Sequence, residues 1–302
     1  MTGYIDLHTH TVASDGKLKV SQLIKKAKEA SLAALGITDH DSIGSLEEAL
    51  KEGDRVGLEV VPGCELTSYR GEKEFHILGY YLDFRNEQFC ERLKFLQKTR
   101  EERAKKIVEK LNRLGYQVNF QEVRNLAAGA IVLPHIVGAV LKNSENKTKL
   151  LNEFGEVQNI GVFIDRYLVR GAPAYVSKEG FEPDEAIKTI HQLGGLAVLA
   201  HPCWDLTKVV QGNTFFDQDF YLEELAKSNL DGVEAIAYRE NDEITKVCVD
   251  HFSELAERFD LAITGGSDFH GYREIGKDLG LVNVYLKVPY SCLERLKGKK
   301  HD

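Results

Sequence analysis

The chain has 302 residues, 43% of them hydrophobic, which is enough to bury a full core as one large domain or as one domain with an insertion. Its 39 basic and 47 acidic residues give a net charge of -8, which excludes a global basic field that would recruit nucleic acid or a membrane. No apolar stretch approaches membrane-spanning length, no signal peptide is apparent, and the five cysteines are scattered without a Cys-x-x-Cys pair. We therefore expect a cytoplasmic protein with reduced thiols.

Short apolar runs alternate with helical patterns in the first part of the chain. An amphipathic helix is predicted over residues 20–30, and the capping-box pattern Ser45-Leu-Glu-Glu48 marks the start of the next helix. Strands are predicted over residues 4–8, 33–38, 58–65 and 74–82.

The alternation stops between Leu82 and Gly171. Residues 86–114 read as one long, charged helix, and shorter helical patterns follow from 121 to 168. We interpret residues 82–172 as a helical insertion that acts as a substrate cap, between two parts of one barrel domain at 1–81 and 173–302.

Strands and helices alternate again after Pro173. The predicted helices cover residues 183–193, 219–228 and 241–258, and the predicted strands cover 196–200, 231–236 and 261–265. This repetition indicates an α/β protein with a parallel sheet or barrel, whose catalytic groups would gather at the C-terminal ends of the strands.

Residues of metal-ligand type stand at those strand ends. His8 and His10 are two positions apart in an extended segment, so their side chains project from the same face, and a short turn can bring Asp15 back beside them. The full set of candidates is His8, His10, Asp15, His40, Glu65, His76, His201, Asp268 and His270. Nine ligands exceed the needs of one ion, and the imidazole–carboxylate mixture suits manganese, zinc or iron, so two or three divalent metal ions are expected.

These residues also carry a family resemblance. The motifs are His8-Thr-His10 with Asp15, Thr38-Asp-His40-Asp, Gly63-Cys-Glu65, His76-Ile-Leu-Gly79, Ala200-His201-Pro202 and Gly266-Ser-Asp268-Phe-His270-Gly271. In this order they resemble the polymerase and histidinol phosphatase (PHP) superfamily of metal-dependent phosphoesterases. The longer elements around His76, Pro173 and Asp268 are similar to the stand-alone branch with a helical insertion. That branch includes nucleoside 3',5'-bisphosphate phosphatases and exonucleases that trim short RNA from the 5' end.

The resemblance implies a distorted (β/α)7 barrel with a trinuclear metal site, manganese being favoured over zinc and iron. The first metal would take His8, His10, Glu65 and Asp268, the second Glu65, His76 and His201, and the third Asp15, His40 and His270. A metal-bound hydroxide held by the first group would attack the phosphate. Asp39 and Asp41 flank a ligand and are expected to support the site or cap a helix.

Substrate contacts are expected in the insertion. The resemblance assigns Arg103 and His135 to the substrate, but Leu133 stands where the family's Arg-Pro-His element has its arginine. If that arginine holds a second phosphate, its absence weakens the case for a nucleoside bisphosphate and leaves room for another small phosphate ester.

The leading hypothesis is a metal-dependent phosphatase acting on a small phosphorylated metabolite, most of all a nucleotide such as a nucleoside 3',5'-bisphosphate, with 5'-3' trimming of short RNA as a related activity. A cyclic sugar phosphate phosphodiesterase and a histidinol-phosphate phosphatase are alternatives among hydrolases. A non-catalytic metal-binding regulatory domain is the alternative of another class, although all nine ligand positions are filled. No membrane and no stable nucleic-acid partner are expected.

Overall fold

The computed structural model describes residues 3–71, 73–127, 129–155, 159–271, 279 and 287–300. The chain divides into two compact units, the barrel unit (Met1–Cys90 with Phe181–Asp302) and the helical unit (Glu91–Gly180). Each unit has a hydrophobic core of its own. Within the described ranges, no helix combines the length and the apolar character needed to cross a membrane.

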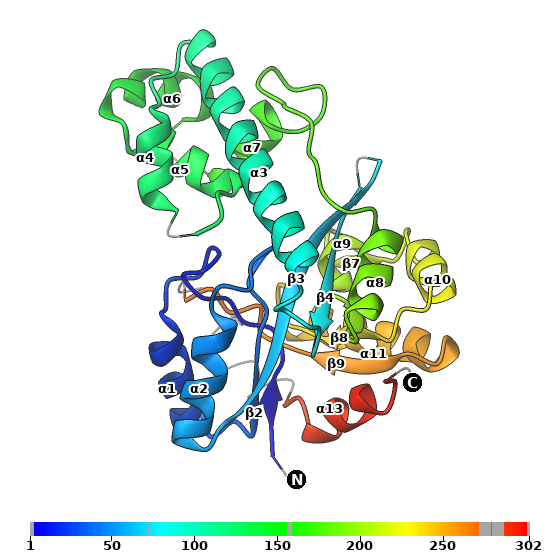
Figure 1. The fold of residues 1–302 in the computed structure, drawn as a ribbon. Helices are drawn as coiled ribbons and strands as arrows, with labels where there is room; N and C mark the ends of the chain where they lie inside the picture. The colour runs from blue at the N-terminus through cyan, green and yellow to red at the C-terminus, as the bar shows by residue number, and fades with distance from the viewer. Residues whose placement is uncertain are drawn as a thin grey trace. The chain divides into compact units, whose positions relative to one another are not determined.

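The barrel unit is built on a sheet of seven strands in the described part of the chain (Figure 1). Their order across the sheet is β1-β2-β3-β4-β5-β8-β9. The strands are β1 (Ile5–Asp6), β2 (Ala34–Ile37), β3 (Glu59–Arg70), β4 (Lys73–Tyr80), β5 (Leu196–Leu199), β8 (Gly232–Ile236) and β9 (Ala262–Gly265). Each lies at a segment that the sequence predicted to be a strand.

The two outer strands of this sheet approach each other. Leu7 N donates to Gly265 O at 3.2 Å just beyond β1 and β9, and Thr9 pairs with Phe269 as an isolated parallel bridge. The sheet is therefore a nearly closed barrel, and the prediction of a distorted α/β barrel is confirmed.

One strand departs from the parallel arrangement. β4 runs antiparallel to both β3 and β5, whereas the other neighbours in the sheet are parallel. Only two residues separate β3 from β4, which allows a hairpin but not the crossover that parallel strands require. The antiparallel direction places His76, near the middle of β4, level with Thr67 of β3.

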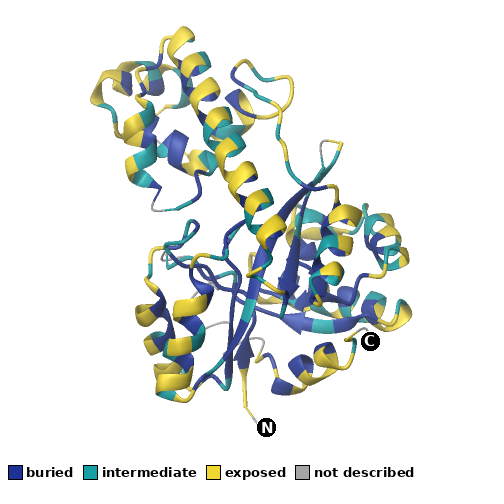
Figure 2. Ribbon diagram, viewed as in Figure 1, coloured by how far each residue is buried: buried dark blue, intermediate teal, exposed yellow. Residues whose placement is uncertain are grey.

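Amphipathic helices cover the barrel. In α1 (Val20–Glu29) the buried residues Val20, Leu23, Ile24 and Ala27 form one stripe at helical spacing. The exposed outer faces of the helices and the buried strands are visible in Figure 2. The other helices of this unit are α2 (Leu46–Val56), α8 (Pro183–Gln192), α9 (Pro202–Asp205), α10 (Phe220–Lys227), α11 (Asp242–Arg258) and α13 (Tyr290–Lys297), and a small hairpin joins β6 (Lys208–Val210) to β7 (Asn213–Phe215).

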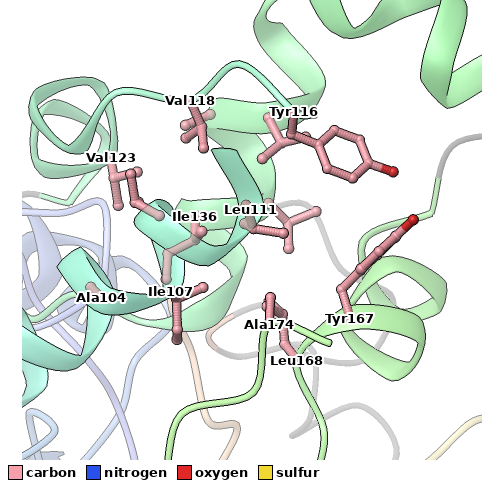
Figure 3. Close-up of a cluster of buried hydrophobic side chains, with 14 of the residues drawn as sticks. Ala104, Ile107, Leu111, Tyr116, Val118, Val123, Ile136, Tyr167, Leu168 and Ala174 are labelled. Carbon is pink, nitrogen blue, oxygen red and sulfur yellow. The ribbon is translucent and has the colours of Figure 1, made fainter. Parts of the chain in front are cut away.

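The helical unit contains most of α3 (Glu87–Arg113), which matches the long charged helix expected from the sequence. Ile107 and Leu111 of α3 pack against Tyr116, Ile136 and further apolar residues in a core that Figure 3 shows in close-up. The remaining helices are α4 (Phe120–Leu126), α5 (Leu133–Lys142), the short 3-10 helix η1 (Ser144–Asn146), α6 (Lys147–Phe154) and α7 (Ile160–Tyr167). This unit is thus held together by apolar helix packing.

Candidate metal centre

All nine candidate ligands belong to the barrel unit, and the ends of its strands bring them together. His8 and His10 follow β1, and the turn in which Gly16 N donates to Thr11 O returns Asp15 towards them. The other six come from later strands: His40 follows β2, Glu65 lies in β3, His76 in β4, His201 follows β5, and Asp268 and His270 follow β9.

The first group surrounds a single point. His8 Nε2 lies 3.1 Å from both His10 Nε2 and Glu65 Oε2, and Asp268 Oδ1 lies 3.2 Å from His10 Nε2. Metal–ligand bonds of about 2.0–2.2 Å place neighbouring ligand atoms roughly 3–3.5 Å apart around one ion. These four side chains therefore fit a metal ion.

A second group shares Glu65. Glu65 Oε1 lies 2.9 Å from His76 Nδ1 and 3.1 Å from His201 Nε2, and the two imidazole nitrogens are 3.1 Å apart. The two oxygens of Glu65 thus face different sets of imidazoles, which is the geometry of a carboxylate that bridges two ions. His40 also approaches this carboxylate, with Nδ1 3.2 Å from Oε2.

The side chains of the third group are more widely spaced. Asp15 Oδ1 lies 3.2 Å from His270 Nε2 and 3.7 Å from His10 Nδ1, while Asp15 Oδ2 lies 3.9 Å from His40 Nε2. In the described ranges these four residues form one of three overlapping groups with the spacing of a metal site. The other two are His8 with His10, Glu65 and Asp268, and His40 with Glu65 and His76.

Burial and neighbouring charges shift the pKa values of the side chains in this cluster. Burial raises the pKa of the Glu65 carboxyl, but the histidines around it, with His40 first, outweigh burial and hold the pKa well below its usual range. Burial lowers the pKa of His10, but hydrogen bonds with Asp268 and Glu65 raise it to about 10. Metal binding at His10 would therefore compete with protonation of its imidazole.

Glu234 of β8 belongs to the site, and the sequence analysis missed it. Its buried carboxylate lies 3.0 Å from His8 Nδ1 and accepts a hydrogen bond from the His201 backbone N at 2.9 Å. This contact orients the imidazole of His8, and it would favour the proton on Nδ1 when Nε2 binds a metal ion. The only signal in the sequence is one glutamate inside an otherwise apolar strand.

Asp39 organises the loop that carries Asp15. Its Oδ1 accepts from Thr11 N at 2.7 Å and Ser14 Oγ at 2.6 Å, and its Oδ2 accepts from Ser45 Oγ at 2.5 Å. Ser45 precedes α2 as the capping pattern predicted, but its hydroxyl binds Asp39 instead of capping the helix. The carboxylate of Asp41 accepts from Thr67 N at 3.0 Å, so both aspartates hold backbone near the ligands.

The backbone is strained at three positions in this region. Asp41, His201 and Asp268 have positive φ angles of 44°, 27° and 52°, a conformation that residues other than glycine rarely adopt. Gly266 allows a close approach, because a Cβ there would lie 2.4 Å from His8 Cβ and 2.7 Å from Glu234 Oε1. The close packing of Gly266 against His8 and Glu234 therefore helps to hold the candidate ligands in position.

The two predicted substrate contacts lie in the helical unit. Arg103 Nε donates to Val176 O at 3.0 Å, and His135 Nδ1 accepts from Val132 N at 3.2 Å where α5 begins. Leu133 is the first residue of α5. These contacts position both side chains within their own unit, and their role towards a substrate stays a prediction.

Comparison with known proteins finds a family and individual relatives whose sequences are similar to this chain. Residues 6–118 match the model of the PHP domain family. A 5'-3' exoribonuclease of Haemophilus influenzae is 30% identical over 292 residues, which cover 95% of this chain and 98% of that protein. A 3',5'-nucleoside bisphosphate phosphatase of Chromobacterium violaceum is 28% identical over 277 residues, which cover 91% and 90% of the two chains.

The fold has a counterpart among solved structures. The crystal structure of a provisionally assigned metal-dependent phosphoesterase from Bifidobacterium adolescentis superposes with a TM-score of 0.76 at 24% identity, covering 99% of this chain and 96% of that one. The chain belongs to the PHP family of metal-dependent phosphoesterases.

Proposed function

We propose that this phosphoesterase removes a phosphate group from a small nucleotide, using two or three divalent ions held by the nine clustered side chains. The main support for this proposal is the position of the Glu65 carboxylate. Its Oε2 lies 3.1 Å from His8 Nε2, while its Oε1 lies 2.9 Å from His76 Nδ1. One carboxylate shared by two imidazole sets supports a multinuclear centre, which is the arrangement that phosphate-ester hydrolysis uses.

The ligand sets are those that the family resemblance implies. We assign one ion to His8, His10, Glu65 and Asp268, a second to Glu65, His76 and His201, and a third to Asp15, His40 and His270. When bound, the ions would bring the pKa of a coordinated water towards neutrality and offset the charge on the phosphoryl oxygens. The histidine and carboxylate ligands suit manganese, zinc and iron alike, and we propose manganese because the family resemblance favours it.

The charge of the site indicates that a phosphate substrate needs bound metal ions there. Asp15, Glu65 and Asp268 bring three carboxylates to the site. Without bound metal ions, these carboxylates would repel a phosphate dianion. Divalent ions would reverse the sign of the local charge, so the net charge of -8 over the whole chain does not prevent phosphate binding at the site.

The two relatives described above act on nucleotide material according to their names, which supports a nucleotide as the substrate. A third relative, 30% identical over 275 residues, is named a phosphoribosyl 1,2-cyclic phosphate 1,2-diphosphodiesterase, which supports the cyclic sugar phosphate as the second candidate. We propose that the helical unit contributes to recognition through Arg103 and His135. Leu133, in place of an arginine, favours a substrate with one phosphate over a nucleoside bisphosphate.

A phosphate-release screen with the manganese-loaded protein tests the proposal. AMP, adenosine 3',5'-bisphosphate, 5'-phosphorylated oligonucleotides, a cyclic sugar phosphate, sugar monophosphates and histidinol phosphate should be compared by kcat/KM. We expect the highest value for a nucleotide and two or three manganese ions per chain. A cyclic sugar phosphate or histidinol phosphate as the best substrate would replace the proposal.

A further inference from the structure

An arginine and a tryptophan stack on each other in the barrel unit. The guanidinium carbon of Arg239 lies 3.9 Å from the centre of the Trp204 ring, within the range of a cation–π contact. Arg239 is only 7% exposed, and its Nε has no hydrogen-bond partner among the described residues. The stack with Trp204 is therefore a main contact of this buried guanidinium.

The stack adjoins the metal centre. Trp204 belongs to the short helix α9, and its backbone N donates to the carbonyl of His201 at 2.9 Å, so Trp204 follows a candidate ligand within one turn of the backbone. Arg239 follows β8, the strand that carries Glu234, and β8 pairs directly with β5, which precedes His201. Both side chains thus come from the strand ends that carry the ligands.

Part of the Trp204 side chain is accessible to solvent. Trp204 is 43% exposed even though Arg239 covers part of its ring. A large aromatic surface beside a phosphate-hydrolysing centre suits a flat aromatic partner, since bases stack on aromatic side chains irrespective of their sequence. The buried guanidinium would fix the orientation of the indole before a ligand arrives.

We propose that the exposed surface of Trp204, held in place by Arg239, stacks with the base of a nucleotide whose phosphate lies at the metal centre. This inference rests on the proposed function and adds the class of leaving group to it: an aromatic nucleoside in preference to a sugar without a base. Selectivity would then come partly from the barrel unit itself.

Kinetics on a matched pair of substrates test the proposal. AMP and ribose 5-phosphate share the ester and the sugar but differ in the base. For Trp204→Leu we expect kcat/KM for AMP to fall about 5- to 100-fold, mainly through KM, and the value for ribose 5-phosphate to stay within about twofold. Trp204→Phe keeps an aromatic face and should retain most of the preference. Equal losses on both substrates would assign Trp204 a structural role only and overturn the proposal.

A binding measurement separates this inference from the proposed function. Trp204 is the only tryptophan of the chain, so its fluorescence reports directly on stacking. Adenosine, which has no ester to hydrolyse, should quench the fluorescence of the manganese-loaded protein saturably, and ribose should not. Arg239→Met should weaken the adenosine response, and Arg239→Lys should weaken it less. Absence of quenching by adenosine contradicts the stacking site, whereas quenching without turnover on any ester contradicts the proposed function alone.

Discussion

Both units of the protein bury an apolar core, but only the barrel unit also buries a cluster of charged and imidazole side chains among the described residues. The barrel unit keeps Glu65, Asp39 and the imidazoles of His8 and His10 out of solvent, whereas the core of the helical unit consists of residues such as Ile107 and Phe163. Buried charge is costly unless it is paired, and buried apolar surface stabilises the fold. The barrel unit thus combines an apolar core with the candidate metal ligands, whereas the core of the helical unit is apolar, so substitutions of the ligands and of the helical core should have separable effects.

The largest effect is expected at the first ligand group. Asp268→Ala should lower kcat/KM by at least about 1,000-fold, because it removes a charged ligand that the chemistry needs. Metal analysis should show less bound manganese, while the circular dichroism spectrum and the unfolding temperature of the metal-free protein stay close to those of the wild type. His191→Ala is the matched control, since His191 pairs with Asp231 at 2.7 Å outside the cluster. Near-normal turnover of Asp268→Ala would remove this residue from the mechanism.

In the helical unit, a core substitution is expected to lower stability and to leave metal binding unchanged. Leu111→Ala deletes a fully buried side chain and should destabilise that unit by about 2–5 kcal/mol through the lost packing and the cavity. Urea unfolding followed by circular dichroism measures the loss. The number of manganese ions per chain should not change, and a variant that loses its metal would show that the two units are not separable.

An intermediate effect is expected for Glu234→Gln. The amide retains the size of the side chain but loses the charge that holds the proton on His8 Nδ1, so affinity for manganese should fall about 10- to 100-fold. Titration with a metal-sensitive dye gives the affinity directly. A reduction in kcat with unchanged metal affinity would indicate that Glu234 acts on the substrate instead.

The smallest effect is expected for Arg103→Ala. If Arg103 contacts the substrate, KM should rise several-fold with little change in kcat, because the lost contact is equally present in the ground and transition states. Lys110→Met is the matched control, because Lys110 also donates to a backbone carbonyl of the neighbouring segment, that of Tyr175. Equal kinetic constants for both variants and the wild type would confine Arg103 to its hydrogen bond with Val176.

Much of this structure could be predicted from local patterns. Strands such as β2 and β9 are short apolar runs that end in ligand-type residues, and residue spacing alone identified His8 and His10 as a pair. The reversed direction of β4 was missed because hydrophobic periodicity reports burial and not strand direction. Glu234 was missed for another reason: its function depends on a residue 226 positions away in the sequence, which no local pattern encodes.

The shared carboxylate of Glu65 would link the proposed metal positions to one another. Its two oxygens lie 3.1 Å from His8 Nε2 and 2.9 Å from His76 Nδ1, so an ion bound on one side would fix the carboxylate orientation that the other side needs. Loading should therefore be cooperative, with the first ion lowering the ordering cost of the second. Because partly loaded protein would then be scarce, activity should rise more steeply than linearly with metal concentration.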